Sequence, residues 1–299
     1  MILQKCKLLT TKKRLIKSII FFLAFIVFHA CNKRIENPIK INEVTPWCIV
    51  NFDSLERSPF ERIKMLKNMG FTKYGYNWDN EHLDYLKEEF ALAKENNIEI
   101  TSIFLWLNAK RDGIGELSPE NERLFSLLSE VEYKPAIWLS FSDNFFKDST
   151  QEKCLSTAIE FVKSIKNKAD KIGCKIALYN HHGWFGNPYN QIEIIESLPN
   201  DSLSIVYNFH HAHQYLDDYA EIAKRITPYL SYVNINGMKR EGPQILTIGD
   251  GDHEQEMIKI LFDEGFEGPW GILGHIKTKD VKKVLERNIN GLKSMKLVK

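Results

Sequence analysis

The chain has 299 residues, of which 43% are hydrophobic and 26% are charged, a composition typical of a globular protein with a large apolar core. Its formal net charge at pH 7 is +1. Because six basic residues and no acidic residue lie in the first thirty positions, the remainder of the chain is mildly acidic. That charge disfavours a nucleic-acid partner, which would require a basic surface.

The first thirty residues predict a signal peptide. A positively charged segment precedes an unbroken apolar run over residues 19–28, which suits a signal-peptide core and is too short to cross a bilayer comfortably. Ala30 and Cys31 then resemble the end of a bacterial lipobox. We expect lipidation of Cys31 and a polar tether over residues 31–45. The protein would be an exported, membrane-anchored lipoprotein on the periplasmic side or at the cell surface; an uncleaved anchor is the alternative.

From residue 46 onward, amphipathic segments alternate with short apolar runs, which predicts one domain over residues 46–299. Strands are expected at eight runs rich in β-branched and aromatic residues: Cys48–Phe52, Tyr74–Trp78, Ile98–Leu107, Pro135–Phe141, Lys175–Asn180, Leu203–Phe209, Tyr232–Asn236 and Trp270–Leu273. Helices are expected between them, several ending at Gly or Asn. This alternation predicts an α/β protein, a single (β/α)8 TIM barrel. The alternative, an open doubly wound sheet, requires a glycine-rich phosphate turn after an early strand. The sequence has none, so we expect no nucleotide cofactor.

Three of the nine histidines, His210, His211 and His213, follow the sixth expected strand within four positions. Imidazole can exchange a proton near neutral pH and can bind a metal ion. In a TIM barrel the chemistry lies where strands end and helices begin. A single histidine there would be an ordinary loop residue, but three after a buried strand indicate a site. The candidate catalytic residues are His211, His181 and His213.

Amide and indole side chains recur at the expected strand ends. Amides can hydrogen-bond hydroxyl groups as donor or acceptor, and indole faces stack on sugar rings. Each Asn alone could be a turn residue and each Trp a core residue, but their joint recurrence favours a neutral polyhydroxylated ligand over a phosphate. The candidate substrate-binding residues are Asn77, Trp106, Asn180, Trp184, Asn208, Asn234, Asn236 and Lys239.

The second half of the expected barrel resembles the sugar phosphate isomerase/epimerase family of xylose-isomerase-like TIM barrels. The run Tyr179–Trp184 is similar to the family's Glu-Asn-His-Gly motif, and Asn208–His211 is similar to its Asp-x-x-His motif. Three later segments resemble its seventh strand, the Gly-x-Gly loop before the following helix, and its eighth strand: Tyr232–Asn236, Ile248–Asp252 and Trp270–Gly274.

The sequence departs from the family's pattern at the positions that would bind the metal ion. The resemblance implies a divalent ion held by Glu, Asp, His and Glu, but those positions here are Tyr179, Asn208, Asn234 and Gly274. Two alternatives stay open. A three-histidine site made by His181, His211 and His275 would suit Zn, Mn, Co or Ni. Otherwise the pocket is metal-free, and its histidines act only as acid, base and hydrogen-bond partners.

The resemblance implies an enzyme that acts on a sugar bearing a carbonyl group. A histidine removes the proton beside the carbonyl. The enediolate then regains a proton, as in an isomerase or epimerase, or expels a leaving group from a 3-keto-glycoside, as in a lyase. A second class is a non-catalytic lipoprotein of this fold that binds saccharides at the cell surface. The expected partners are a small sugar or glycoside and, through the lipid, a membrane.

Overall fold

The computed structural model describes residues 39–298. The predicted signal peptide and Cys31 lie outside these residues. Eight strands occur in the described chain: β1 (Thr45–Trp47), β2 (Lys73–Tyr76), β3 (Glu99–Leu107), β4 (Ala136–Phe141), β5 (Ile176–Tyr179), β6 (Ser204–Asn208), β7 (Leu230–Ile235) and β8 (Trp270–Leu273). They form one parallel sheet in the order β1-β8-β7-β6-β5-β4-β3-β2.

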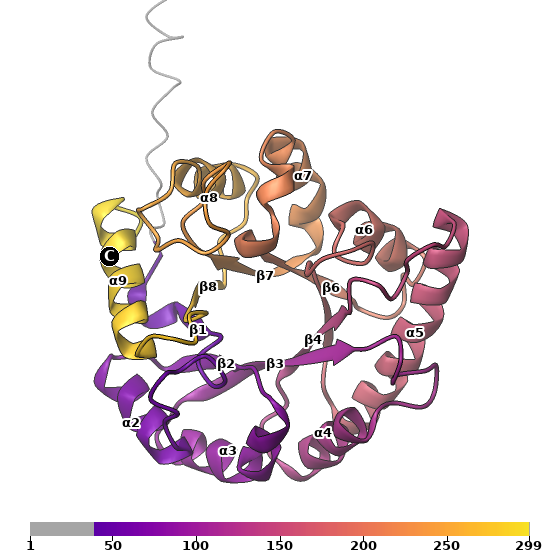
Figure 1. The fold of residues 1–299 in the computed structure, drawn as a ribbon, viewed down its shortest axis with the longest axis horizontal. Coiled ribbons are helices and arrows are strands. Elements are labelled where there is room, and N and C mark those ends of the chain that lie inside the picture. Colours follow the sequence, from indigo (N-terminus) through magenta and orange to yellow (C-terminus); the bar gives the residue numbers. More distant parts are fainter. Residues whose placement is uncertain (1–38, 299) are drawn as a thin grey trace, which may run out of the picture. The chain divides into compact units, whose positions relative to one another are not determined.

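The sheet curls into a nearly closed barrel, with its two end strands β1 and β2 next to each other (Figure 1). The α-helices form a ring outside the strands: α2 (Pro59–Asn68), α3 (Leu86–Glu95), α4 (Pro119–Glu130), α5 (Gln151–Ile172), α6 (Pro188–Glu196), α7 (Tyr219–Ile226), α8 (Glu254–Asp263) and α9 (Val281–Ser294). The predicted (β/α)8 TIM barrel is therefore confirmed. Within residues 39–298, no helix has the length and apolar character needed to cross a membrane.

Local signals explain where the helices begin and end. At the start of α2, the Ser58 hydroxyl accepts a hydrogen bond from the backbone N–H of Glu61, whose carboxylate accepts one from the N–H of Ser58. This capping box satisfies N–H groups that have no partner in the first turn of a helix. At the end of α5, Gly173 takes a left-handed conformation that disfavours continuation of the helix.

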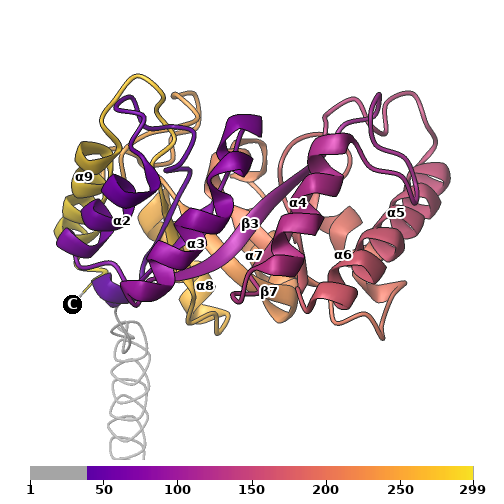
Figure 2. The same ribbon diagram turned by 90° about the horizontal axis from the view of Figure 1, so that it is seen from below.

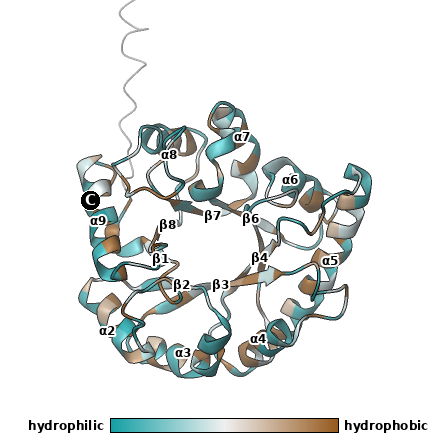
Figure 3. Ribbon diagram, in the orientation of Figure 1, coloured by the Kyte–Doolittle hydropathy of each residue, from teal (hydrophilic) through white to brown (hydrophobic). Residues whose placement is uncertain are grey.

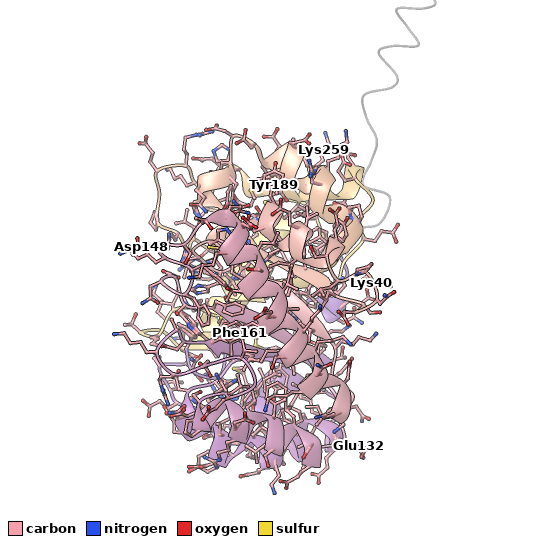
Figure 4. All side chains as sticks on the ribbon, turned by 90° about the vertical axis from the view of Figure 1, so that its right-hand side faces the viewer. Lys40, Glu132, Asp148, Phe161, Tyr189 and Lys259 are labelled. Carbon is pink, nitrogen blue, oxygen red and sulfur yellow. The ribbon has the colours of Figure 1, made fainter. Side chains whose placement is uncertain are left out.

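The hydropathy pattern matches this arrangement. The strands are mostly hydrophobic, whereas the helices carry both hydrophobic and hydrophilic residues (Figure 3). Phe161 of α5 is buried and packs edge-on against Phe141 at the end of β4, with ring centroids 5.6 Å apart (Figure 4). Charged residues such as Glu132 and Asp148 lie at the outside of the molecule in the same view. The outer helices thus bury one face against the sheet.

The barrel interior is filled by aromatic rings. Trp47 of β1 packs against Trp138 of β4 at 4.4 Å between centroids, and Trp138 lies 5.0 Å from Tyr232 of β7. Tyr179 of β5 stacks on Trp138 at 5.9 Å. These large side chains close the barrel from below, so any ligand must bind above them at the carboxyl ends of the strands.

The first strand differs from the prediction. It spans Thr45–Trp47, whereas the sequence predicted Cys48–Phe52. Cys48 has a positive φ of 56°, which ends the strand. Past it, the backbone N–H groups of Ile49 and Val50 donate to the side-chain oxygen of Asn77 instead of a strand partner. Cys48, Ile49 and Val50 are buried, as expected of an apolar run, but the prediction that they form a strand is wrong.

The structured chain also begins earlier than residue 46. The backbone N–H of Ile39 donates to the carbonyl of Leu297 at 2.7 Å, and Ile39 forms a parallel bridge with Val298. Ile39 and Val44 are buried. Residues 39–45, expected in the tether, are therefore part of the barrel. The segment was predicted as a tether because most of its residues are polar, but its apolar residues Ile39 and Val44 are buried.

Candidate functional site

A cavity of about 700 Å³ lies at the carboxyl ends of the strands. Its lining comes from segments that follow β1, β2, β3, β5, β6 and β8. Trp47, Tyr179 and Leu273 belong to strands and contribute to its wall, and the aromatic packing below them blocks the barrel axis. The cavity therefore occupies the place where TIM barrels hold their active sites.

Five histidines line the cavity and contact one another. His211 is at their centre: its ring centroid lies 4.3 Å from those of His181 and His210 and 4.6 Å from that of His182. The fifth ring, His275, lies 5.1 Å from that of His210. We call these five residues the histidine cluster. The closest polar contact is between Nδ1 of His211 and Nε2 of His182, at 3.3 Å.

The loop after β5 brings two consecutive histidines to the cavity. In a strand they would point to opposite faces, but β5 ends at Tyr179 and the N–H of His181 turns back to the carbonyl of Tyr179 at 2.8 Å. The loop then folds onto itself at Gly186, where a Cβ would lie 2.1 Å from the carbonyl oxygen of His181. His182, which was not among the candidate residues, therefore joins the cluster. Its adjacency to His181 was the signal.

The loop after β6 is shaped by Asn208. Its side-chain oxygen accepts a hydrogen bond from the N–H of His210 at 3.1 Å and starts a short 3₁₀ helix, Phe209–His211. Its side-chain amide donates to the hydroxyl of Tyr179. The tight turn directs both His210 and His211 into the cavity. Asn208 thus positions the cluster from β6, and it also lines the cavity.

Burial keeps these imidazoles neutral. Desolvation lowers the pKa of His211 well below its usual value of 6.5, and the neighbouring imidazoles add to the shift. Desolvation likewise lowers the pKa of His181 to about 3 and those of His210 and His275 to about 4. At neutral pH each of these four rings has one nitrogen free to accept a proton or to bind a metal ion.

Aromatic side chains form one wall of the cavity. Trp106 is 38% exposed, and its ring meets that of His181 edge-on with centroids 4.6 Å apart. Phe104 lies 6.1 Å from Trp106 at an interplanar angle of 90°. Phe52 also lines the cavity and contacts His275, with ring centroids 3.8 Å apart. An exposed indole beside a cluster of imidazoles is suited to stacking against the apolar face of a sugar ring.

The rim is polar, and its cations are already paired. Arg111 forms an ion pair with Glu120, and the Nζ of Lys277 lies 3.9 Å from Asp79. Asp79 also accepts a hydrogen bond from the side-chain amide of Asn51. Because each cation faces a carboxylate, the rim offers little attraction for a phosphate group. This arrangement agrees with an uncharged ligand.

The structure separates the predicted site residues into two groups. Those that line the cavity are Asn77, Trp106, His181, Asn208, His211 and His275. The second group does not line it: Asn180, Trp184, His213, Asn234, Asn236 and Lys239.

The members of the second group have other environments. Asn180 is fully buried and exchanges hydrogen bonds with the backbone of Asn208, so it joins β5 to β6. The indole N–H of Trp184 donates to Gln151 on the outside of the barrel. Asn236 donates to the carbonyls of Gly237 and Gln244.

The remaining three residues also lie outside the cavity. Nδ1 of His213 lies 3.3 Å from the carbonyl of His210, and burial lowers the pKa of His213. Asn234 is fully buried inside the barrel. Lys239 is exposed, with its Nζ 3.9 Å from Asp252. His213, a predicted catalytic residue, thus lies outside the cavity and contacts the backbone of His210.

The list of candidate residues left out several residues that line the cavity. These are Asn51, Phe52, Trp78, Phe104, His182 and His210 as lining side chains. Two of them, His182 and His210, stand next to residues that were selected. In a strand, neighbouring side chains point to opposite faces, but the turns after β5 and β6 bring both members of each pair to the cavity.

The four positions at which the resemblance implies metal ligands carry no carboxylate. Tyr179 and Asn208 are hydrogen-bonded to each other, and Asn234 is buried. At Gly274 a Cβ would lie 2.5 Å from Val281 and 2.8 Å from the carbonyl oxygen of Cys48, so no side chain fits. The donor atoms of the histidine cluster are imidazole nitrogens, a set that suits Zn, Co or Ni better than Mg.

Comparison with known proteins supports the same fold. A profile of the family described as "Xylose isomerase-like TIM barrel" matches residues 60–295. No curated protein sequence matches the chain. One similar solved structure is 3-keto-D-glucoside 4-epimerase from E. coli in its apo form, with 16% identity, a TM-score of 0.62, and coverage of 84% of this chain and 99% of that chain.

Two further structures extend the comparison. D-psicose 3-epimerase solved with D-fructose has 13% identity and a TM-score of 0.61, covering 84% of this chain and 98% of that chain. A xylose isomerase-like TIM barrel protein from Mycobacterium smegmatis, solved in complex with magnesium, has 13% identity and a TM-score of 0.56, covering 87% of this chain and 97% of that chain. At these identities the likeness shows the fold alone.

Proposed function

The chain belongs to the xylose isomerase-like TIM barrel family, and from this premise we propose that it is an enzyme that removes a proton beside the carbonyl of an uncharged sugar. The substrate would be a keto-sugar or a 3-keto-glycoside. The observation that carries this proposal is the histidine cluster: five imidazoles, with His211 at their centre, line the cavity beside an exposed indole. The similar structures named as sugar epimerases support a sugar substrate.

The proposed chemistry follows from the state of the imidazoles. A carbonyl makes the neighbouring C–H acidic, and a neutral imidazole can accept that proton while the electron pair enters an enediolate. Return of the proton to the same carbon from the other face gives an epimer, and return to the former carbonyl carbon gives an isomer. If a glycosidic oxygen is β to the carbanion, its bond breaks and the departing oxygen takes a proton, which gives a lyase reaction.

Because these imidazoles have low pKa values, proton removal also requires stabilisation of the negative charge that develops on the substrate. An imidazole with a pKa of about 4, such as His210 or His275, is always ready to accept a proton at neutral pH but is a weak base. The carbonyl oxygen must therefore be stabilised as charge develops on it. The cluster can donate hydrogen bonds from imidazole N–H groups to that oxygen. A divalent ion such as Zn, Mn, Co or Ni, if held by nitrogens of the cluster, would supply further polarisation of the carbonyl.

Proton abstraction can be tested without knowing the product. The purified full-length chain is incubated in D2O with a panel of uncharged keto-sugars and 3-keto-glycosides, and deuterium entering the carbon beside the carbonyl is followed by NMR. We expect exchange or turnover with at least one member. His211→Asn should lower that rate by a factor of about 10² to 10⁴. His253→Asn is the matched control, because His253 lies at the start of α8 and does not line the cavity.

The alternative class gives a different result. A saccharide-binding protein would bind members of the panel, measured by calorimetry, with no deuterium exchange and no product. The absence of carboxylates at Tyr179, Asn208, Asn234 and Gly274 is the observation that favours this second candidate. Exchange that persists at the wild-type rate in His211→Asn would show that His211 is not the base and that a different histidine takes its place.

A further inference from the structure

We propose that His181, His182 and His211 together bind one divalent ion of the zinc type through three imidazole nitrogens. The sequence predicted His181, His211 and His275 as the ligands, and in the proposed set His182 takes the place of His275. It lies in the loops after β5 and β6 and uses none of the four positions at which the resemblance implies ligands. One ligand nitrogen from each of the three residues lies within 4.8 Å of the others.

The distance between two of the nitrogens matches a shared ion. Nδ1 of His211 and Nε2 of His182 are 3.3 Å apart. A tetrahedral zinc ion with Zn–N distances of about 2.0–2.1 Å holds two ligand nitrogens about 3.3 Å apart. The third nitrogen, from His181, can approach by rotation of its side chain, since its partners already lie within 4.8 Å. An ion between these rings would take the place of the hydrogen bond that the two nitrogens otherwise share.

A carboxylate stands where the outer partner of a metal ligand is expected. Nδ1 of His181 is buried and has no hydrogen-bond partner within the described chain, and it lies 3.7 Å from Oδ1 of Asp143 in the segment after β4. Histidines that bind metals usually donate their second ring N–H to a carboxylate or carbonyl. Asp143 would therefore orient His181 so that Nε2 faces the ion. We assign Asp143 as a positioning residue.

The site has the composition of a reactive metal centre with room for a ligand. Three protein nitrogens leave a fourth tetrahedral position, and all three histidines line the cavity, so that position opens towards a bound molecule. Nitrogen ligands without carboxylates favour Zn, Co or Ni over Mg, which prefers oxygen. His275 is excluded from the set because it contacts Phe52 and its nearest ring in the cluster is that of His210.

Calorimetry on the full-length chain, stripped of metals by a chelator and then dialysed, tests the proposal. Zinc chloride should bind as one ion per chain, magnesium chloride should not bind at the same concentrations, and cobalt should produce the visible absorption of a tetrahedral nitrogen site. His182→Gln should weaken zinc binding at least about 100-fold and Asp143→Asn about 10-fold. His275→Gln and His253→Gln should leave the zinc affinity within about threefold of wild type.

Circular dichroism on each variant shows whether the fold is retained. Absence of zinc binding by the wild type overturns the proposal. A variant His182→Gln that folds and binds zinc normally, together with loss of binding in His275→Gln, would overturn the assigned set in favour of His275. Because no substrate is present, these outcomes are independent of whether the protein exchanges protons of a sugar.

Discussion

The side-chain amide of Asn208 donates to the hydroxyl of Tyr179, so the two positions at which the resemblance implies a metal-binding Asp and Glu are hydrogen-bonded to each other. Both side chains are buried. The same Asn208 accepts from the N–H of His210. One side chain therefore joins β5 to β6 and shapes the loop that carries two histidines of the cluster.

We expect Asn208→Ala to destabilise the protein by about 1–3 kcal/mol, because it leaves the buried Tyr179 hydroxyl and the N–H of His210 without their partner. Urea denaturation measures the loss. In the Tyr179→Phe background the same substitution should cost about 1 kcal/mol less, since the hydroxyl is already absent. Equal costs in both backgrounds would show that the two side chains are not coupled.

The stability of the metal-free protein should depend on pH in the acidic range. The native state holds His210 and His275 with pKa values of about 4, whereas their ordinary value is 6.5. Below pH 6.5 the unfolded chain binds protons that the native state does not, so unfolding becomes easier as the pH falls towards 4. Above pH 6.5 this contribution is complete and constant.

The contribution of His275 to this pH dependence of stability can be measured with one variant. Each such histidine contributes up to about 1.4 kcal/mol per pH unit within its window. Urea denaturation in the presence of a chelator should show stability falling between pH 6.5 and 4 in the wild type, and a shallower fall in His275→Gln. If the two curves are parallel, His275 is not held neutral by the fold.

Trp106 should contribute to ligand affinity with little effect on the fold. Its ring is 38% exposed and lies over the edge of His181, where a sugar ring can stack. Trp106→Ala should weaken binding of the identified sugar about tenfold, which corresponds to about 1.4 kcal/mol. Calorimetry measures the affinity, and the change is compared with that in Trp184→Ala, whose ring lies outside the cavity. Equal losses in the two variants would contradict the assignment.

Export and lipidation remain predictions, because Cys31 lies outside residues 39–298. The basic segment, the apolar run and the pair Ala30-Cys31 motivate them. Metabolic labelling of cells with a palmitate analogue should tag the wild-type chain in the membrane fraction. Labelling of Cys31→Ala to the same extent would show that the lipid is attached elsewhere or that the sequence acts as a plain anchor.

The barrel was predictable because its signals are local and repeated. Apolar runs alternate with amphipathic segments, and stop signals such as Gly70 and Gly173 separate them. The first strand was misplaced because its end depends on a distant side chain: Asn77 binds the backbone past Cys48, which no local propensity shows. The alternation of strands and helices was enough to predict the architecture, whereas the end of the first strand depended on tertiary contacts.

The site was predicted in part for the same reason. Position at a strand end correctly brought His181, His211 and His275 to one cavity. It did not separate them from Asn234, which lies within β7, or from Asn236, which follows it, although neither lines the cavity. It also missed His182, because the turn that presents two adjacent histidines depends on the contact of Gly186 with the backbone of His181. Strand ends indicate which loops matter, and loop packing decides which side chains face the ligand.

The bridge between Ile39 and Val298 fixes the side of the barrel at which the described chain begins. This bridge lies before β1, at the amino-terminal ends of the strands, and the carboxyl end of the chain lies at the lower edge of the barrel, with the strand β3 pointing away from it (Figure 2). The cavity is at the other end of the strands. The described chain therefore begins at the face opposite the cavity, and residues 39–44 take no part in lining the cavity.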